Sequence, residues 1–332
     1  MKQSASRRSA LWRIAFYVIV FGLVQKPASG AEDGYPSRPV HIIVPLAAGG
    51  ATDILARPIA AKLHQMLGQP FVVENRGGAG GNIGGEVVAH AAPDGYTILF
   101  TSSGLVVANK FVFEKMNFDP DKDFVPIVTI ASLSNVLVVP KKSPFNSVRD
   151  IIDSAKKEPG RLFFGSGGVG TSNHLAGELF EFLEGIDIKH VPYRGGGPAV
   201  IAALSGEVSM LFATVPTAIG HINSGEFKPL AVTGESRSPL LPEVPTMNEA
   251  GVSGFTMDVW IGALAPRNTS PEIVAKLNGA IGKVLMDPEV VSVLKREGYE
   301  PAAGTPQEME AKIQKESALW QKVIAAAGSR IQ

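Results

Sequence analysis

Short apolar runs alternate with amphipathic stretches along most of the chain, and this pattern predicts an α/β fold. Residues 40–44 form a continuous apolar strand pattern, and the apolar positions between 53 and 67 recur at helical spacing. A strand at 71–73, a helix at 82–90 and a strand at 96–100 follow. We therefore expect an open parallel sheet covered by helices in the first hundred residues.

The segment between residues 161 and 215 repeats this order of elements without repeating the residues themselves. It predicts further elements at 162–164, 174–183, 186–191, 198–204 and 208–212. In both segments a strand ends in a glycine-rich turn that opens a helix. Because ligands of such sheets bind outside the carboxyl ends of the strands, the two similar halves predict a cleft between them.

Two apolar segments connect the halves and predict the domain organisation. The chain enters the second half near residue 137 and returns through Trp260–Ala265, after which helices are expected at 271–286, 288–297 and 306–327 on the first half. We expect one lobe at 31–136 plus 260–332 and a second lobe at 137–259. Two crossing strands would form the hinge of a closing two-lobed binder.

Residues 1–30 have the layout of a signal peptide. A basic start is followed by an apolar run of 11 residues, 14–24, and by the small residues Ala28 and Gly30 before the predicted cleavage site. That run is too short to span a membrane. We expect secretion to the periplasm; Ser6-Arg7-Arg8 leaves twin-arginine export open, and an uncleaved anchor is the alternative.

Charge and composition exclude several classes of function. The full chain has 31 basic and 31 acidic residues, and residues 1–30 contain five of the basic ones and no acid. The mature chain therefore carries an excess of five acidic residues, which argues against nucleic acid as a partner. The sequence has no cysteine, and its six histidines lack metal-binding spacing. We expect no metal site and no cofactor.

The candidate ligand site lies in the two glycine-rich turns, at 46–52 and 165–173. Neither turn contains lysine or arginine. Backbone N–H groups in such turns, together with helix N-termini, bind anions. The polar strand end at 101–104 is expected at the same edge. The turns therefore predict capture of a small carboxylate by backbone amides and by hydroxyl and amide side chains.

Other interpretations of the same residues stay open. Gly165, Gly167 and Gly170 match the dinucleotide-binding pattern, but Asp187 precedes the next strand, where the ribose-binding acid should follow it. Ser166 lacks the flanking glycines of a hydrolase elbow, and no paired carboxylates stand near the turns. An enzyme is the less supported alternative. As an alternative to ligand binding, the glycines would serve only the tight packing of strands and helices. Asp53 would then act only as a helix cap.

Several motifs, in order along residues 35–328, resemble one known family. They include VPLAAGGATDILAR, VVENRGGAGGNIGG, FGSGGVGTSNHLAGELF, HVPYRGGGPAV and WIGALAP. The chain resembles the Bug-type (TctC-like) periplasmic receptors of tripartite tricarboxylate transporters. This resemblance implies a two-lobed type II periplasmic binding protein (Venus-flytrap) fold. It also implies a monomeric, non-enzymatic receptor that delivers a small organic carboxylate or dicarboxylate to a membrane permease. A carboxylate sensor for a membrane signalling partner is the alternative.

The predicted ligand-binding residues come from the two turns and the neighbouring strand ends, and none is assigned a catalytic or metal-binding role. They are Ala47, Ala48, Gly49, Gly50, Thr52, Asp53, Gly81, Ser102, Ser103, Ser166, Gly167, Gly170, Thr171, Ser172, Asn173, His174, Tyr193 and Thr214.

Three positions depart from the family's usual pattern. Leu46 stands where Phe or Tyr is common, Ala213-Thr214 where an Asp-Asn pair is common, and Ile261 where Tyr is common. The loss of a hydroxyl and a carboxylate makes the pocket less polar. We therefore predict a ligand that carries a carboxylate but no amino group, with an aliphatic or aromatic body.

Overall fold

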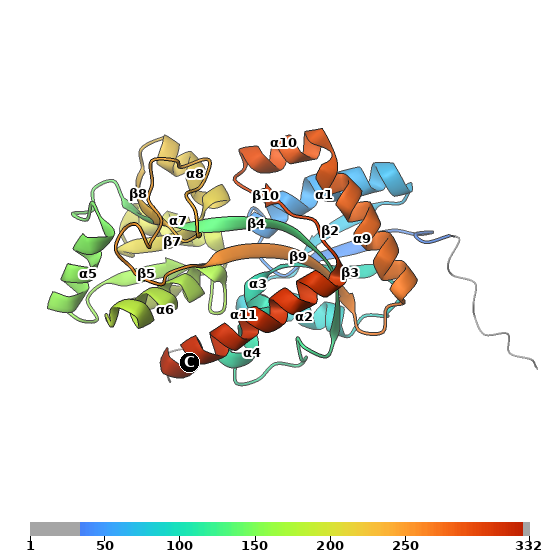
Figure 1. Cartoon of the computed structure of the whole chain (residues 1–332), viewed down its shortest axis with the longest axis horizontal. Coiled ribbons are helices and arrows are strands. Elements are labelled where there is room, and N and C mark those ends of the chain that lie inside the picture. The colour runs from blue at the N-terminus through green and yellow to red at the C-terminus, as the bar shows by residue number, and fades with distance from the viewer. Residues whose placement is uncertain (1–33, 328–332) are drawn as a thin grey trace, which may run out of the picture. The chain divides into compact units, whose positions relative to one another are not determined.

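The computed structural model describes residues 34–327, so the predicted signal peptide lies outside the described residues. None of the helices in this range is both long enough and apolar enough to cross a membrane. The described chain contains the predicted α/β elements, arranged in two sheet regions that share one long strand (Figure 1).

The first region is built on three parallel strands, as the sequence predicts. Strand β1 (Val40–Val44) lies between β2 (Phe71–Asn75) and β3 (Thr97–Ser102). Helices α1 (Ala51–Leu67) and α9 (Pro271–Met286) cover this sheet, because their apolar faces bury residues such as Leu55, Ile59 and Leu277. The other elements here are η1 (Ala79–Gly81), α2 (Asn82–Ala89), α3 (Ser103–Val107), α4 (Asn109–Val112), α10 (Pro288–Arg296) and β10 (Glu300–Pro301).

The second region repeats this arrangement. Strand β5 (Phe163–Ser166) pairs in parallel with β6 (Lys189–Pro192) and β7 (Met210–Thr214). Helix α6 (Ser172–Glu184) follows β5, and α7 (Gly196–Ser205) follows β6. The remaining elements of this region are α5 (Val148–Lys157), α8 (Val215–Asn223) and β8 (Phe227–Val232). The architectural repeat predicted from the sequence is therefore present.

Strand β4 (Phe124–Pro140) passes from one region to the other. Its first part, up to Ser134, pairs antiparallel with β9 (Asp258–Pro266), and from Asn135 onward it pairs with β7 and β8. The segment forms one strand of 17 residues although Ser132, Ser134 and Asn135 interrupt its apolar pattern, because these polar residues pair through their backbone with β9 or β7. Figure 1 shows β4 and β9 side by side between the two regions.

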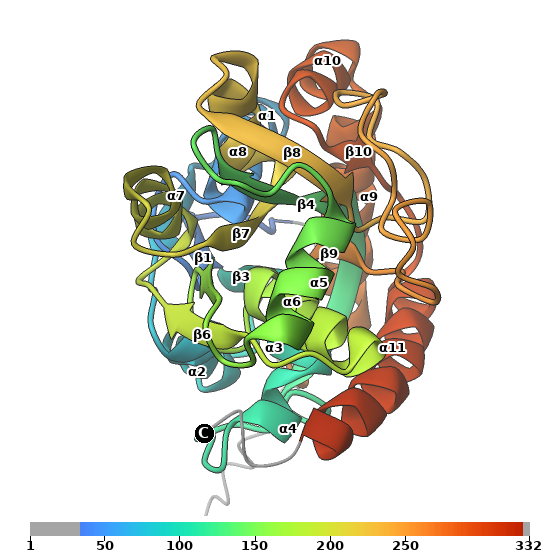
Figure 2. The ribbon, with the colours of Figure 1, turned by 90° about the vertical axis from the view of Figure 1, so that its left-hand side faces the viewer.

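The last helix, α11 (Pro306–Ala327), reaches further than expected. It packs on the first region, as expected, against β4, α3 and α4, and it also packs against α6 of the second region. Trp320 and Val323 share a hydrophobic core with Leu179 and Phe180. A helix of 22 residues is about 33 Å long, so it reaches beyond one region. Figure 2 shows α11 next to α3 and α4, with α6 close by.

Candidate functional site

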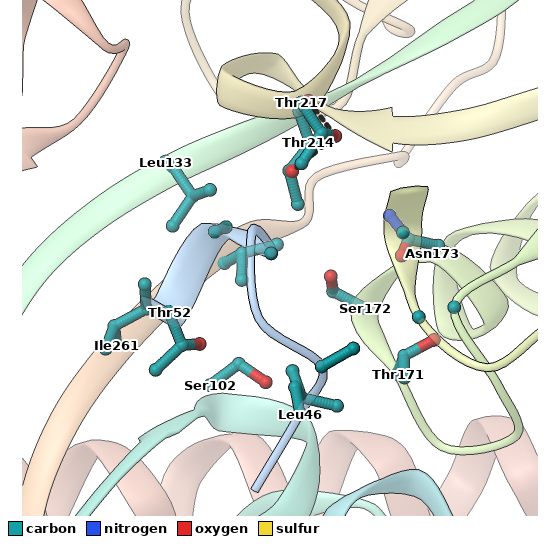
Figure 3. Close-up of a pocket in the computed structure, with 17 residues that line it drawn as sticks. Leu46, Thr52, Ser102, Leu133, Thr171, Ser172, Asn173, Thr214, Thr217 and Ile261 are labelled. Atoms are coloured by element: carbon teal, nitrogen blue, oxygen red, sulfur yellow. Dashed lines mark hydrogen bonds between the residues drawn. The ribbon is translucent and has the colours of Figure 1, made fainter. Parts of the chain in front are cut away.

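A pocket lies between the two regions, at the carboxyl ends of β1, β3, β5 and β7. It contains about 530 Å³ of empty space, part of which is open to solvent. Its lining comes from both predicted turns and from the two crossing strands (Figure 3). The lining residues are Leu46, Ala47, Gly50, Ala51, Thr52, Ser102, Leu133, Gly167, Thr171, Ser172, Asn173, Gly195, Gly196, Thr214, Thr217, Val259 and Ile261.

Besides the five-residue α3, four longer helices begin at this pocket, and none of these four has a side-chain cap. The N-cap residues are Gly50 for α1, Thr171 for α6, Gly195 for α7 and Thr214 for α8. No side chain accepts a hydrogen bond from the first-turn amides at these four positions. The first N–H groups of a helix have no partner within the helix. These four N-termini therefore present unpaired donors and positive dipole ends toward one space.

Three helices that begin away from the pocket do have side-chain caps. Ser147 accepts from Asp150 N–H at α5, Ser270 accepts from Ile273 N–H at α9, and Asp287 accepts from two first-turn amides at α10. A side-chain cap stabilises a helix by about 1 kcal/mol. The short helices α2 and α4 lack a side-chain cap as well, so what distinguishes the four pocket helices is that their uncapped N-termini meet at one space.

Asp53 holds the first loop from behind rather than lining the pocket. Its Oδ2 accepts from Gly49 N–H at 2.9 Å, and both of its oxygens accept from Arg57, at 2.8 and 3.1 Å. Burial alone would raise the pKa of Asp53, but hydrogen bonds from Arg57, Gly49 and Asn75 outweigh it and lower that pKa. The sequence suggested Thr52 or Asp53 as the helix cap. The cap is Gly50, and Asp53 lies in the first turn of α1.

Two histidines support the second loop. A hydrogen bond of 2.5 Å joins Ser166 Oγ to His190 Nε2, and Ser166 Oγ also accepts from Gly168 N–H. The His190 ring stacks on Phe164 and lies 4.2 Å from the His174 ring, centre to centre. Burial, and secondarily the nearby His174, lowers the pKa of His190 to about 3. His190 is therefore uncharged at neutral pH.

The His174 ring is turned away from the pocket. Its Nδ1 accepts from Gly170 N–H at 3.2 Å, and its Nε2 faces Glu178 Oε1 at 3.4 Å, with both side chains buried. His174 therefore fixes the tip of the second loop from below. Both ring nitrogens therefore face groups of the second loop and of α6.

Amide side chains fix the start of α6 against the sheet. Asn173 Nδ2 donates to Phe212 O at 2.5 Å, and it lies 3.4 Å from Asn135 Oδ1. Asn135 Nδ2 in turn donates to Ser172 O at 3.3 Å. Both asparagines are buried. These bonds orient the α6 N-terminus, so its amides keep a fixed direction toward the pocket.

Part of the pocket lining is apolar. Leu46, Leu133, Val259 and Ile261 contribute it, from the first loop and the two crossing strands. Figure 3 shows Leu133 and Ile261 on one side of the space and Thr171, Ser172 and Asn173 on the other. Within residues 34–327 no acidic or basic side chain lines the pocket. Its only charge complementarity to an anion comes from dipoles and hydrogen-bond donors.

The structure brings half of the sequence-predicted residues to the pocket wall. Ala47, Gly50, Thr52, Ser102, Gly167, Thr171, Ser172, Asn173 and Thr214 line it. Gly81 and Tyr193 lie instead along an adjoining glycine-lined groove that shares Leu46, Ala47, Gly167 and Gly195 with the pocket. Ala48, Gly49, Asp53, Ser103, Ser166, Gly170 and His174 do not line the pocket.

Several lining residues were not predicted as site residues. Leu133 and Val259 come from the crossing strands, and their positions depend on the pairing of β4 with β9. Thr217 lies in the first turn of α8, and its hydroxyl bonds to Thr214. Gly195 and Gly196 belonged to a glycine run that the sequence marked only as a turn. The missed lining residues are Leu46, Ala51, Leu133, Gly195, Gly196, Thr217, Val259 and Ile261.

Comparison with known families identifies the chain's relatives. The family model described as "Tripartite tricarboxylate transporter family receptor" matches residues 55–329. The chain belongs to this receptor family. Protein BugT of Bordetella pertussis (strain Tohama I) is 35% identical over 320 residues, which cover 96% of this chain and 97% of BugT. The resemblance to Bug-type receptors is therefore confirmed.

Solved structures of similar proteins share the fold and contain carboxylates. R. palustris Rpa4515 with adipate is 39% identical, with a TM-score of 0.85, and the match covers 89% of this chain and 98% of that one. MatC (Rpa3494) from Rhodopseudomonas palustris with bound malate is 33% identical, with a TM-score of 0.83 and coverage of 87% and 100%. These likenesses confirm the two-lobed periplasmic binding protein fold.

Proposed function

We propose that this receptor captures a small organic carboxylate between its two loops and delivers it to a membrane permease. The observation that carries the proposal is the meeting of four uncapped helix N-termini at a pocket without lysine or arginine. A carboxylate placed there would accept from the amides at the starts of α1, α6, α7 and α8. The hydroxyls of Thr52, Ser102 and Ser172 would add further donors.

Such a site needs no positively charged side chain to bind in the micromolar range. A partly buried helix N-terminus contributes up to about 2 kcal/mol toward an anion. A hydrogen bond to a charged group contributes roughly 1.5–3 kcal/mol. Micromolar affinity corresponds to about 8 kcal/mol, so a few such interactions are sufficient.

The lining favours a ligand without an ammonium group. An ammonium needs acceptors, and the nearest carboxylate, Asp53, is already paired with Arg57 and Gly49 N–H behind the loop. Leu133, Val259 and Ile261 offer an apolar surface for the body of the ligand. We infer an aliphatic or aromatic carboxylate, and the adipate and malate in the two similar structures support this class.

The family supports the remaining parts of the proposal. A receptor of a tripartite tricarboxylate transporter acts with a membrane permease, and membership of this family supports export of the chain to the periplasm. We infer lobes at 31–136 plus 260–332 and at 137–259, supported by the exchange of β4 partners between Ser134 and Asn135. A sensory role for the same carboxylate would use the same pocket.

The dinucleotide-binding alternative finds little support. The acid that would bind a ribose must follow β6, but Pro192 and Tyr193 stand there. Asp187 precedes β6 and pairs with Lys189 at 2.9 Å. We propose that the glycines at 165, 167 and 170 serve the loop around the pocket rather than a cofactor.

Thermal unfolding of the mature chain against a panel of ligands tests the function. The panel contains adipate, malate, benzoate, alanine and nicotinamide adenine dinucleotide, added after unfolding and refolding to remove any co-purified ligand. A ligand at 100 times its dissociation constant should add about 2.7 kcal/mol of stability, on the order of 5 °C. We expect shifts with the first three only. A shift with alanine alone would contradict the ligand class, and one with the dinucleotide alone would contradict the receptor function.

A further inference from the structure

The tip of the second loop lies against the first region outside the pocket, at positions where at least one of the two facing residues is a glycine. Gly104 in α3 faces the carbonyl oxygen of Gly170, and Gly80 in η1 faces that of Val169. Gly170 itself lies against Asn109 Oδ1 at the start of α4. We call these five residues the glycine contact. It joins the two regions directly beside Thr171, where the α6 N-terminus reaches the pocket.

Gly104 is the informative member of this contact. It lies within α3 and has no positive φ, so an alanine is compatible with its backbone conformation. A Cβ added there would lie 2.5 Å from Gly170 O and 3.5 Å from Leu175 Cδ1, both in the second region. Gly80, by contrast, has a φ of 62°, which itself disfavours a side chain. Of these two glycines, Gly104 is therefore the one at which a methyl group is excluded by the second region and not also by its own backbone conformation.

Asn109 indicates that the contact separates. Its Nδ2 donates to Gly80 O at 3.1 Å and to Asn82 Oδ1 at 2.7 Å, both within the first region. Its Oδ1, which faces Gly170, is buried without a hydrogen-bond partner, one of two such side-chain atoms in residues 34–327. A buried acceptor without a partner is unfavourable in a permanent interface. Water would reach Oδ1 when the second loop moves away.

We propose that the glycine contact is a latch that forms when ligand is held, with Gly104 as the residue that positions the second loop. Without a side chain at 104, the Gly170 carbonyl approaches α3 and the adjoining Thr171, Ser172 and Asn173 reach the ligand. A methyl group at 104 would lie too close to Gly170 O, so the second loop would have to stay further from α3. This inference rests on the proposed carboxylate-binding function and assigns an affinity-setting role to a residue outside the pocket.

The variant Gly104→Ala tests the latch, with Gly279→Ala as its matched control. Gly279 also lies in a helix, α9, also lacks a positive φ, and has open space around its Cβ position. Titration calorimetry uses the carboxylate that gives the largest thermal shift with the wild-type protein. We expect Gly104→Ala to weaken binding at least tenfold through faster release, and Gly279→Ala to leave affinity unchanged. The ligand-free melting temperature of Gly104→Ala should equal or exceed that of the wild type.

Two results would overturn the latch while leaving the receptor function intact. One is unchanged affinity in Gly104→Ala. The other is a ligand-free melting temperature several degrees below wild type, which would mean that the contact is permanent packing. Absence of any wild-type carboxylate binding would contradict the proposed function instead.

Hydrogen exchange on the wild-type protein gives a second test that does not depend on the variant folding. Amides at 168–171 and at 105–109 should gain protection together when ligand is added. Full protection of both segments without ligand would overturn the latch.

Discussion

The two loops that face the pocket present similar donors to it but are supported by different chemistry. The first loop rests on an ion pair, in which buried Asp53 binds Gly49 N–H and Arg57. The second rests on His190 and His174, whose rings lie 4.2 Å apart, centre to centre, and which bind Ser166 Oγ and Gly170 N–H. Both supports do the same work, because each fixes a loop so that a helix N-terminus points at the pocket.

This difference means that the two loops should respond differently to mutation, acid and salt. The first support needs a charged carboxylate, and its hydrogen bonds lower the pKa of Asp53. The second needs an uncharged imidazole, and burial lowers the pKa of His190 to about 3. Moderate acid should therefore weaken the second loop before the first.

The largest effect is expected from Asp53→Ala. This change removes the acceptor for Gly49 N–H and the partner of Arg57, so we expect a loss of roughly 1–3 kcal/mol of stability. Carboxylate affinity should fall as well, because the first loop loses its anchor. Urea denaturation and titration calorimetry measure the two effects. Asp53→Asn keeps one acceptor and should recover part of the loss.

Asp153→Ala is the matched control for that change. Asp153 forms the same type of helical ion pair, with Arg149, but its side chain is 58% exposed whereas that of Asp53 is 5% exposed. Exposed pairs contribute about 0–1 kcal/mol. Equal losses in the two variants would show that Asp53 has no special role in holding the loop.

Acid should destabilise the protein next most strongly, through His190. Because its pKa is lower in the folded state than the ordinary 6.5, the unfolded chain binds the additional proton between about pH 6.5 and 3. Stability is therefore lost as pH falls through that window, by at most about 1.4 kcal/mol per pH unit. Carboxylates such as Asp53, whose pKa is lowered, lose their contribution only below about pH 4.

The window between pH 6.5 and 5 isolates the histidine effect. Urea denaturation of His190→Gln should show a shallower fall in stability across this window than the wild type. His64→Gln, at an exposed position of α1, is the control and should follow the wild type. An identical slope in all three proteins would contradict the role given to His190.

The comparison also shows what sequence alone can predict. Both loops were predictable, because a strand, a glycine turn and a helix follow one another locally in each. The side chains that support the second loop were not predictable, since His190 and Asn135 reach it from strands that are distant in the sequence. The apolar part of the pocket lining depended on the register in which Leu133 and Val259 pair across the crossing strands. The contact of α11 with α6 was not predicted, because the periodicity of α11 shows an apolar face but not that this face covers both regions.

A smaller effect is expected from Leu133→Ala, which tests the apolar part of the pocket lining. Leu133 is 4% exposed and lines the pocket. Burying a methylene contributes about 0.8 kcal/mol, so loss of contact with a ligand chain should weaken binding by about 1 kcal/mol. We expect this for adipate or longer aliphatic carboxylates, and a smaller change for malate. Leu319→Ala is the control. Leu319 is 48% exposed on α11, and its replacement should change the affinity neither for adipate nor for malate.

The smallest effect is expected from salt, and it distinguishes dipoles from charged side chains. Salt screens exposed charges over about 10 Å at 0.1 M ionic strength and about 3 Å at 1 M. No acidic or basic side chain of the described chain lines the pocket, and the donors that meet the ligand are fixed backbone amides. Carboxylate affinity should therefore change by less than about twofold between 0.05 and 0.5 M sodium chloride. A tenfold loss, measured by calorimetry, would mean that an exposed cation such as Arg194 of the adjoining groove contributes most of the attraction, and that the four helix N-termini do not.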